Sequence, residues 1–146
     1  MGKSSYPATR YQPPNIPDYA SFAERRRLSG PTLRHFFKVM SKWELDTKDV
    51  RLLLGGITNR RLKQLSSRTE GRTLSQDQLL RATSLIAIDR CLHQLLSRRQ
   101  ADKWARTPNR QLPGGTPLFN MIAGGLTVLW ELRLSLETQV SEMGEE

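Results

Sequence analysis

The sequence is poor in the residues that most often carry chemistry, with one cysteine and two histidines among 146 residues. The single cysteine, Cys91, excludes an intramolecular disulfide framework and fits a reducing compartment such as the cytoplasm. His35 and His93 lie far apart in the chain, so the sequence offers no ligand cluster with the spacing of a metal site. We therefore predict no metal ion. We interpret Cys91 as a buried thiol and His93 as a partly buried residue of the same helix.

Features of membranes, export and nucleotide-dependent catalysis are also missing. No window reaches the apolar length of a membrane span, and the N-terminus lacks the apolar core of a signal peptide. The glycine pairs at 55–56 and 114–115 lack the Lys-Ser/Thr sequel and the preceding strand of a phosphate-binding loop. With no nucleophile and base in a recognisable arrangement, we predict no catalytic residues, no cofactor and no enzymatic activity. The chain is expected to be soluble and cytoplasmic.

Alternation of apolar and polar residues with a period of two is absent as well, which argues against β-strands. Apolar residues recur at helical spacing instead, so we predict an all-α fold. A second helix is predicted to begin near Thr47, whose hydroxyl can cap it, and to end at Gly55-Gly56. A first helix is predicted to begin after Pro31-Thr32. Its apolar stripe consists of Leu33, Phe36, Phe37, Met40 and Trp43.

The second half of the chain carries further helix signals. Ser75 with Gln78 three residues later forms a capping-box pattern, and the broadly apolar helix that follows is expected to be central. Residues 97–104 suit a short helix or turn. Thr116 and Pro117 suit the start of another helix, which Gly124-Gly125 interrupts before a last helix to about Val140.

Acidic residues are scarce in most of the chain. The formal net charge is +9, and residues 1–110 carry 22 basic and nine acidic side chains against one and five in residues 111–146. A strongly basic protein favours polyanionic partners such as nucleic acid, and the uneven distribution indicates two kinds of surface. The Pro- and Tyr-containing residues 1–31 suit an extended basic arm, either a DNA-contacting segment or a solubilising tail. Within this arm, Arg25-Arg26-Arg27 could lie on a short helix that starts at Asp18 or Ser21.

The segment from Thr58 to Arg68 has the properties of a DNA recognition helix. A short helix, a glycine turn and a second helix follow one another, and Leu62 and Leu65 face inward. Leu52 departs from the pattern, because a small residue normally packs there. Asn59, Arg60, Lys63 and Gln64 are predicted to contact bases, and Arg61 and Arg68 are predicted to contact phosphates. Thr58 is predicted to cap this helix and to belong to the same DNA-binding set. The same pattern fits two amphipathic helices of any bundle with a solvated basic face.

Three motifs in order resemble the Xre/MbcA/ParS antitoxin family. The first is the helix-turn-helix with its Leu-Leu-Gly-Gly-Ile-Thr turn at 53–58, and the second is Leu74-Ser-Gln-Asp-Gln-Leu79. The third is a Pro- and Gly-containing turn that matches the family signature at Trp104, Pro108, Asn109, Leu112, Gly115, Thr116, Pro117 and Leu118. The similarity runs from Leu33 to Thr138. The segment Leu112-Pro-Gly-Gly-Thr-Pro117 departs from it by lacking a basic residue that the family usually has.

The resemblance implies an antitoxin that binds and neutralises a RES-domain, NAD-consuming toxin and represses its own operon. It implies toxin contacts at the eight signature residues and at Trp130 and Arg133 of the last helix. The alternative is a stand-alone helix-turn-helix regulator without a toxin partner. In that case the rear domain would serve only for dimerisation. Independently of this choice, Trp104, Pro108 and Leu118 could serve only to hold the bundle together. A homodimer is expected because operators for such proteins are two-fold symmetric.

These observations divide the chain into five parts. We predict a Pro-rich arm over residues 1–31 and an Xre-like helix-turn-helix domain over 32–73. A linking helix over 74–97 joins it to a toxin-binding domain over 98–140, and an acidic tail occupies 141–146.

Overall fold

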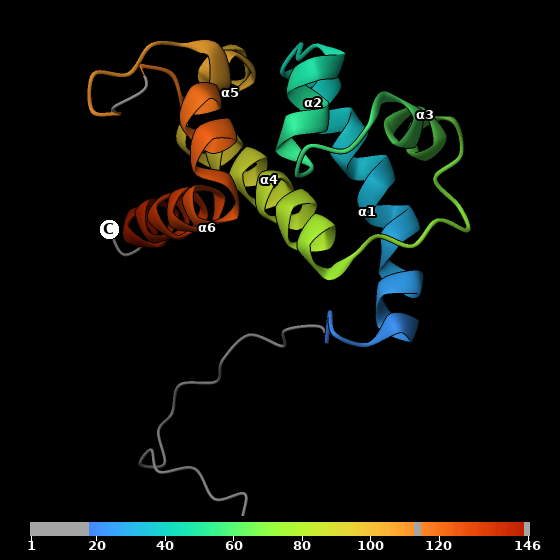
Figure 1. Cartoon of the computed structure of the whole chain (residues 1–146). Helices are drawn as coiled ribbons and strands as arrows, with labels where there is room; N and C mark the ends of the chain where they lie inside the picture. Colours follow the sequence, from blue (N-terminus) through green and yellow to red (C-terminus); the bar gives the residue numbers. More distant parts are fainter. Residues whose placement is uncertain (1–17, 113–114, 145–146) are drawn as a thin grey trace, which may run out of the picture.

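A computed structural model of the chain describes residues 18–112 and 115–144. These residues form helices and no strand, which confirms the all-α prediction. None of the described helices combines the length and the apolar character needed to cross a membrane. The elements in Figure 1 are α1 (Phe22–Lys42), α2 (Thr47–Leu53), α3 (Asn59–Ser67), α4 (Gln76–Leu95), α5 (Arg98–Lys103), the 3-10 turn η1 (Trp104–Arg106) and α6 (Pro117–Met143).

Helix α1 joins the short helix predicted around Arg25-Arg26-Arg27 to the helix predicted from Leu33. It starts at Phe22, after the N-cap Ser21, and continues through Pro31, so the predicted arm over residues 1–31 is wrong for its last ten residues. Proline normally breaks a helix because it lacks an N–H group. Here tertiary bonds hold the first half of α1 in place. The Ser29 hydroxyl donates to Arg25 O at 2.6 Å and accepts from Leu74 N at 2.8 Å, and Arg25 Nε donates to Leu74 O at 3.2 Å. Residues 1–17 of the predicted arm lie outside the described residues.

Helix α4 occupies the centre of the molecule, as predicted, and packs against α1 on one side and α6 on the other (Figure 1). The predicted capping box is confirmed, with the Ser75 side chain accepting from Gln78 N and the Gln78 side chain accepting from Ser75 N. The helix is shorter at both ends than the predicted linking segment. Cys91 is buried, also as predicted, and burial followed by the nearby Glu137 carboxylate raises the pKa of its thiol.

Trp43 joins the front of the molecule to the rear. Its side chain is fully buried, and its ring lies 6.3 Å from that of Trp104 in η1. Its indole Nε1 donates to Asp89 Oδ1 of α4 at 3.1 Å, so the polar group of the buried ring is satisfied. Arg106 Nε donates to Trp43 O at 3.1 Å from the other side. One hydrophobic core therefore runs from α1 to α6.

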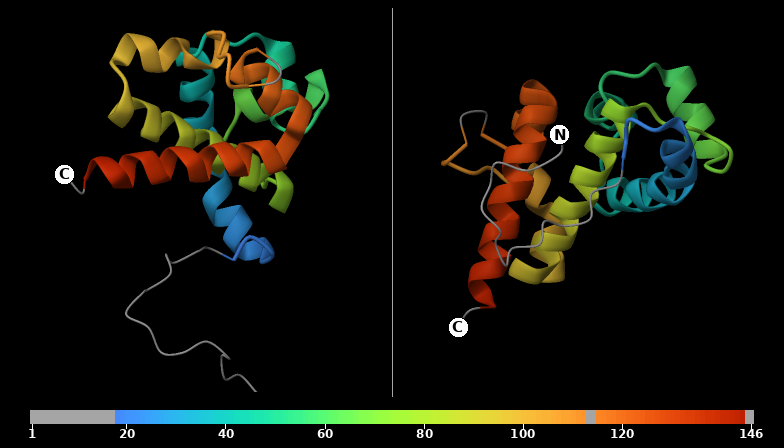
Figure 2. Two further views of the ribbon diagram at one scale, coloured as in Figure 1. Left: turned by 90° about the vertical axis from the view of Figure 1, so that its left-hand side faces the viewer. Right: turned by 90° about the horizontal axis from the view of Figure 1, so that it is seen from below.

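Helix α6 consists of two helical segments joined by a sharp bend. Gly125 has φ 63° and ψ −147°, a conformation that only glycine adopts readily, which confirms the predicted interruption. Figure 2 shows the short first segment turning away from the long second segment. The helix continues to Met143, so residues 141–143 of the predicted tail are helical, and 145–146 lie outside the described residues.

Candidate functional site

The predicted helix-turn-helix consists of α2, the turn at Gly55-Gly56 and α3. Helix α2 starts at Thr47 but its cap is Asp46, whose Oδ1 accepts from Asp49 N at 2.9 Å. Gly55 and Gly56 have φ values of 98° and 81°, a backbone that favours glycine. The N–H groups of Gly56 and Ile57 both donate to Arg51 O, which closes the end of α2. Leu52 is accommodated at a half-buried position, so its size is no obstacle to the turn.

Helix α3 turns its apolar side to the core and a polar, basic side outward. The Thr58 hydroxyl accepts from Arg61 N at 3.0 Å, which confirms Thr58 as the cap. Leu62 and Leu65 are buried, as predicted. The exposed residues of the predicted DNA-contacting set are Thr58, Asn59, Arg60, Lys63 and Arg68. Arg61 and Gln64 are half-buried, so the structure offers Gln64 less freely for base contact than the sequence predicts.

A surface groove of about 440 Å³ lies where the start of α2 meets α3. It is lined by Thr47, Asn59, Leu62, Lys63 and Ser66. Asp46 and Asp49 lie at the N-terminal end of α2, and burial together with the Asp46 charge raises the pKa of Asp49. The positive charge that a phosphate backbone would meet therefore comes from the α3 side, at Arg60, Lys63 and Arg68.

The signature turn between η1 and α6 is held by its own backbone. Asn109 N donates to Gly115 O, Leu112 N donates to Asn109 O at 3.1 Å, and Gly115 N donates to Leu112 O at 3.1 Å. The Asn109 side chain accepts from Gln111 N at 2.9 Å. Gly115 has φ 88°, and Thr116 caps α6 by accepting from Phe119 N at 3.1 Å. These bonds explain the Asn, Gly and Thr of the signature as turn-forming residues.

The predicted partner-binding residues do not form one patch. Pro117 is buried, and Trp104, Asn109, Leu112, Thr116, Leu118 and Arg133 are half-buried, which leaves Pro108, Gly115 and Trp130 exposed. Trp104, Asn109 and Leu112 line a groove of about 310 Å³ together with Leu132 and Leu136 of α6. Trp130 lines a separate groove of about 460 Å³ whose other residues are Leu80, Leu126, Thr127 and Glu131.

Exposed apolar side chains lie on both segments of α6, before and after the bend. Trp130 and Leu134 are 43% and 47% exposed, and Phe119 is 58% exposed. The Arg133 guanidinium lies 5.4 Å from the centre of the Trp130 ring and pairs with Glu137 at 3.5 Å. Helices α3 and α6 lie on opposite sides of α4 in Figure 1 and in the right-hand view of Figure 2, so the basic face of α3 and the apolar side chains of α6 are separate.

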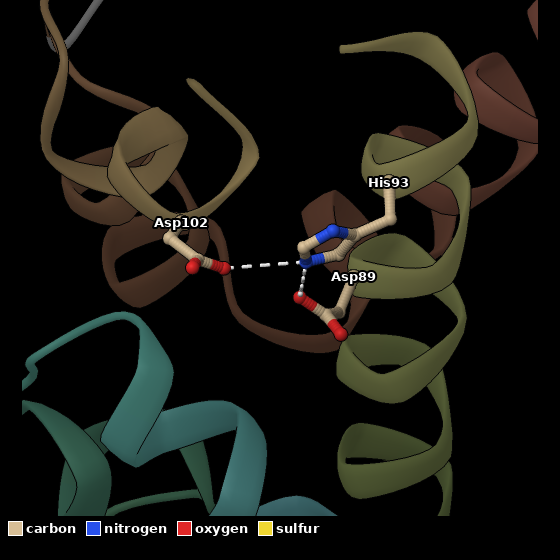
Figure 3. A group of neighbouring side chains, drawn as sticks. All are labelled: Asp89, His93 and Asp102. Carbon is tan, nitrogen blue, oxygen red and sulfur yellow. Dashed lines mark ion pairs between the residues drawn. The ribbon is translucent and has the colours of Figure 1, made fainter. Parts of the chain in front are cut away.

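Sequence reasoning missed one cluster of polar side chains at the junction of α4 and α5. Figure 3 shows His93 with its ring nitrogen Nε2 facing two carboxylates, Asp89 from the same helix and Asp102 from α5. Asp89 is 4% exposed. The signal in the sequence was the four-residue spacing of Asp89 and His93, which places both on one face of a helix. No local sequence pattern indicated that Asp102 of α5 lies next to His93 of α4.

Comparison with known proteins finds a relative but no family. The chain is 29% identical over 108 residues to the uncharacterized protein y4oB of Sinorhizobium fredii (strain NBRC 101917 / NGR234). The similar region covers 73% of this chain and 82% of that protein. No protein-family model matches the chain, and no solved structure matches it.

Proposed function

We propose that this chain is an antitoxin that binds promoter DNA through α3, represses its own operon and neutralises a RES-domain toxin. The observation that carries the proposal is the exposed basic face of α3, which follows a glycine turn and is anchored by Leu62 and Leu65. A helix presented in this way fits the major groove, where arginine recognises guanine and asparagine recognises adenine. Asn59, Arg60 and Lys63 are the side chains we assign to that contact.

The partner half of the proposal is supported by the resemblance and by the exposed apolar residues of α6. Trp130 and Leu134 lie one helical turn apart and are both partly exposed, so they offer a small apolar surface that a partner protein could cover. Because α3 and α6 lie on opposite sides of α4, one molecule can hold DNA and a protein at the same time. That arrangement suits an antitoxin whose complex with its toxin still binds the operator.

The first experiment is to express the open reading frame adjacent to this gene in bacteria, with and without this chain, while growth and cellular NAD are followed. We expect loss of NAD and growth arrest, both prevented by this chain. Growth arrest that this chain prevents without NAD loss would keep the antitoxin and reject the RES partner. Absence of toxicity would favour the stand-alone regulator.

A surface variant separates neutralisation from folding. Trp130→Ser combined with Leu134→Ser changes two exposed residues, and we expect the variant to lose neutralisation while it keeps its circular dichroism spectrum and DNA affinity. The matched control is Phe22→Ser, which changes an exposed apolar residue at the far end of the molecule. Neutralisation that survives the double change would place the toxin contact elsewhere.

A further inference from the structure

The cluster of Asp89, His93 and Asp102 brings three metal-ligating groups together from two helices. One ligand atom of each residue lies within 4.8 Å of the ligand atoms of the other two. His93 Nε2 is 3.4 Å from Asp89 Oδ1 and 3.2 Å from Asp102 Oδ1. The three side chains lie at the end of α4 and in α5, on neither the α3 face nor the outer surface of α6 (Figure 3).

Two of the atoms lack the hydrogen bonds that burial demands. His93 Nε2 and Asp102 Oδ1 are both shielded from solvent, yet neither makes a hydrogen bond of acceptable geometry within the described part of the chain. The imidazole nitrogen lies close to both oxygens without pointing an N–H squarely at either. Buried polar atoms without partners are rare, because each costs about 1–3 kcal/mol. An ion held between the three groups would satisfy both atoms at once.

Two of the three ligand separations are close to the value in a tetrahedral metal centre, and the two carboxylate oxygens lie within 4.8 Å of each other. Bonds of about 2.0–2.1 Å from a zinc ion to nitrogen and oxygen place two ligand atoms about 3.3 Å apart at the tetrahedral angle. The two distances from His93 Nε2 lie on either side of that value. Three protein ligands leave one position for solvent, as in open zinc sites.

The surroundings of Asp89 resemble the outer contacts of a metal ligand. Trp43 Nε1 donates to Asp89 Oδ1 at 3.1 Å, and Lys42 Nζ donates to Asp89 Oδ2 at 2.7 Å. Such hydrogen bonds fix the orientation of a ligating carboxylate. One imidazole and two carboxylates suit zinc and similar first-row ions more than calcium or magnesium, which prefer oxygen ligands alone.

We propose that Asp89, His93 and Asp102 bind one divalent transition-metal ion of the Zn²⁺ class. The ion joins α5 to α4, and α5 leads directly into Trp104 and the signature turn. Metal binding would therefore stabilise the segment that positions this turn, independently of whether the chain is an antitoxin.

The test is a titration of the tag-free, EDTA-treated full chain with Co²⁺, which gives visible d–d absorption in a tetrahedral site, followed by displacement with Zn²⁺. We expect one ion per chain and a rise in the thermal unfolding midpoint with Zn²⁺. His93→Gln and Asp102→Asn should each weaken binding at least about tenfold, because loss of a ligand exceeds the effect of losing its outer contacts. The matched control is His35→Gln, which removes the exposed histidine of α1 and should leave binding unchanged.

Circular dichroism of each variant shows whether it folds. The ion stoichiometry and the shift of the thermal midpoint in the wild type test the proposal even if a variant does not fold. Absence of Co²⁺ absorption and of a Zn²⁺-dependent shift would overturn the proposal. The cluster would then be a polar contact of the His93 ring with the two carboxylates and nothing more. Binding that persists in His93→Gln and disappears in His35→Gln would also overturn it.

Discussion

The front of the molecule, α1 to α3, and the rear, α5 to α6, are both helical but expose different kinds of side chain. In the front, the apolar side chains of the core are buried, and basic side chains lie at the surface of α3. In the rear, a hydrogen-bonded turn and a bent helix leave Trp130, Leu134 and Phe119 exposed. The front therefore presents basic side chains to solvent, and the rear presents apolar ones. The two share Trp43 and α4, so they are regions of one core.

The largest expected effect tests whether the two regions fold as one unit. Trp43→Ala removes a fully buried ring that contacts both regions, and we expect a loss of about 3–5 kcal/mol in the free energy of unfolding. Denaturant unfolding followed by circular dichroism and by Trp104 and Trp130 fluorescence measures it. Trp43→Phe replaces the indole with a phenyl ring that cannot donate to Asp89, and should lower the free energy of unfolding by about 1–3 kcal/mol. Two separate transitions in the wild type would show that front and rear are independent.

The next effect concerns the basic face of α3. Arg60→Ala with Lys63→Ala should weaken promoter binding roughly 30-fold, because each groove contact contributes about 1 kcal/mol or more. The slope of log affinity against log salt should also flatten by up to about 1.8 if both side chains neutralise phosphates. Arg98→Ala with Arg99→Ala is the control, since these exposed arginines lie on α5 in the rear region. Equal losses in the two pairs, measured by fluorescence anisotropy, would remove the distinction between front and rear.

The bend in α6 provides a smaller effect confined to the rear. Gly125→Ala forces a side chain into a conformation that only glycine adopts readily, and should lower the free energy of unfolding by about 1–3 kcal/mol. Gly144→Ala is the control, because Gly144 has φ −73° and needs no special backbone. DNA affinity should stay unchanged in both variants. A Gly125→Ala protein as stable as the wild type would mean that α6 straightens at little cost.

The smallest effect is at the exposed ring of α6. Arg133→Ala removes the cation–π contact with Trp130 and should lower the free energy of unfolding by about 0.5–1 kcal/mol. Arg90→Ala, an exposed arginine of α4, should change it by less than about 0.5 kcal/mol. Chemical denaturation of the three proteins in parallel checks the difference. If Arg90→Ala lowers the free energy of unfolding as much as Arg133→Ala does, the contact of Arg133 with Trp130 contributes nothing beyond the loss of one positive charge.

Local signals in the sequence predicted most helix positions. Thr58, Ser75 and Thr116 act as caps, and the glycine pairs end or bend helices as predicted, because caps and turns depend on neighbouring residues. The candidate base contacts of α3 followed from the same periodicity, since the two buried leucines define the outward face. The proposed roles of that face and of the signature turn stay predictions.

The helical class and most helix ends follow from residues within a few positions of one another, and the uneven charge can be counted along the chain. The continuation of α1 through Pro31 depends on packing instead, because Ser29 and Arg25 form hydrogen bonds with the backbone of Leu74, far along the chain. Packing also decides that Asp102 meets His93 and that Trp104 meets Trp43. Contacts of this kind depend on how whole helices pack, and no local pattern of residues encodes them.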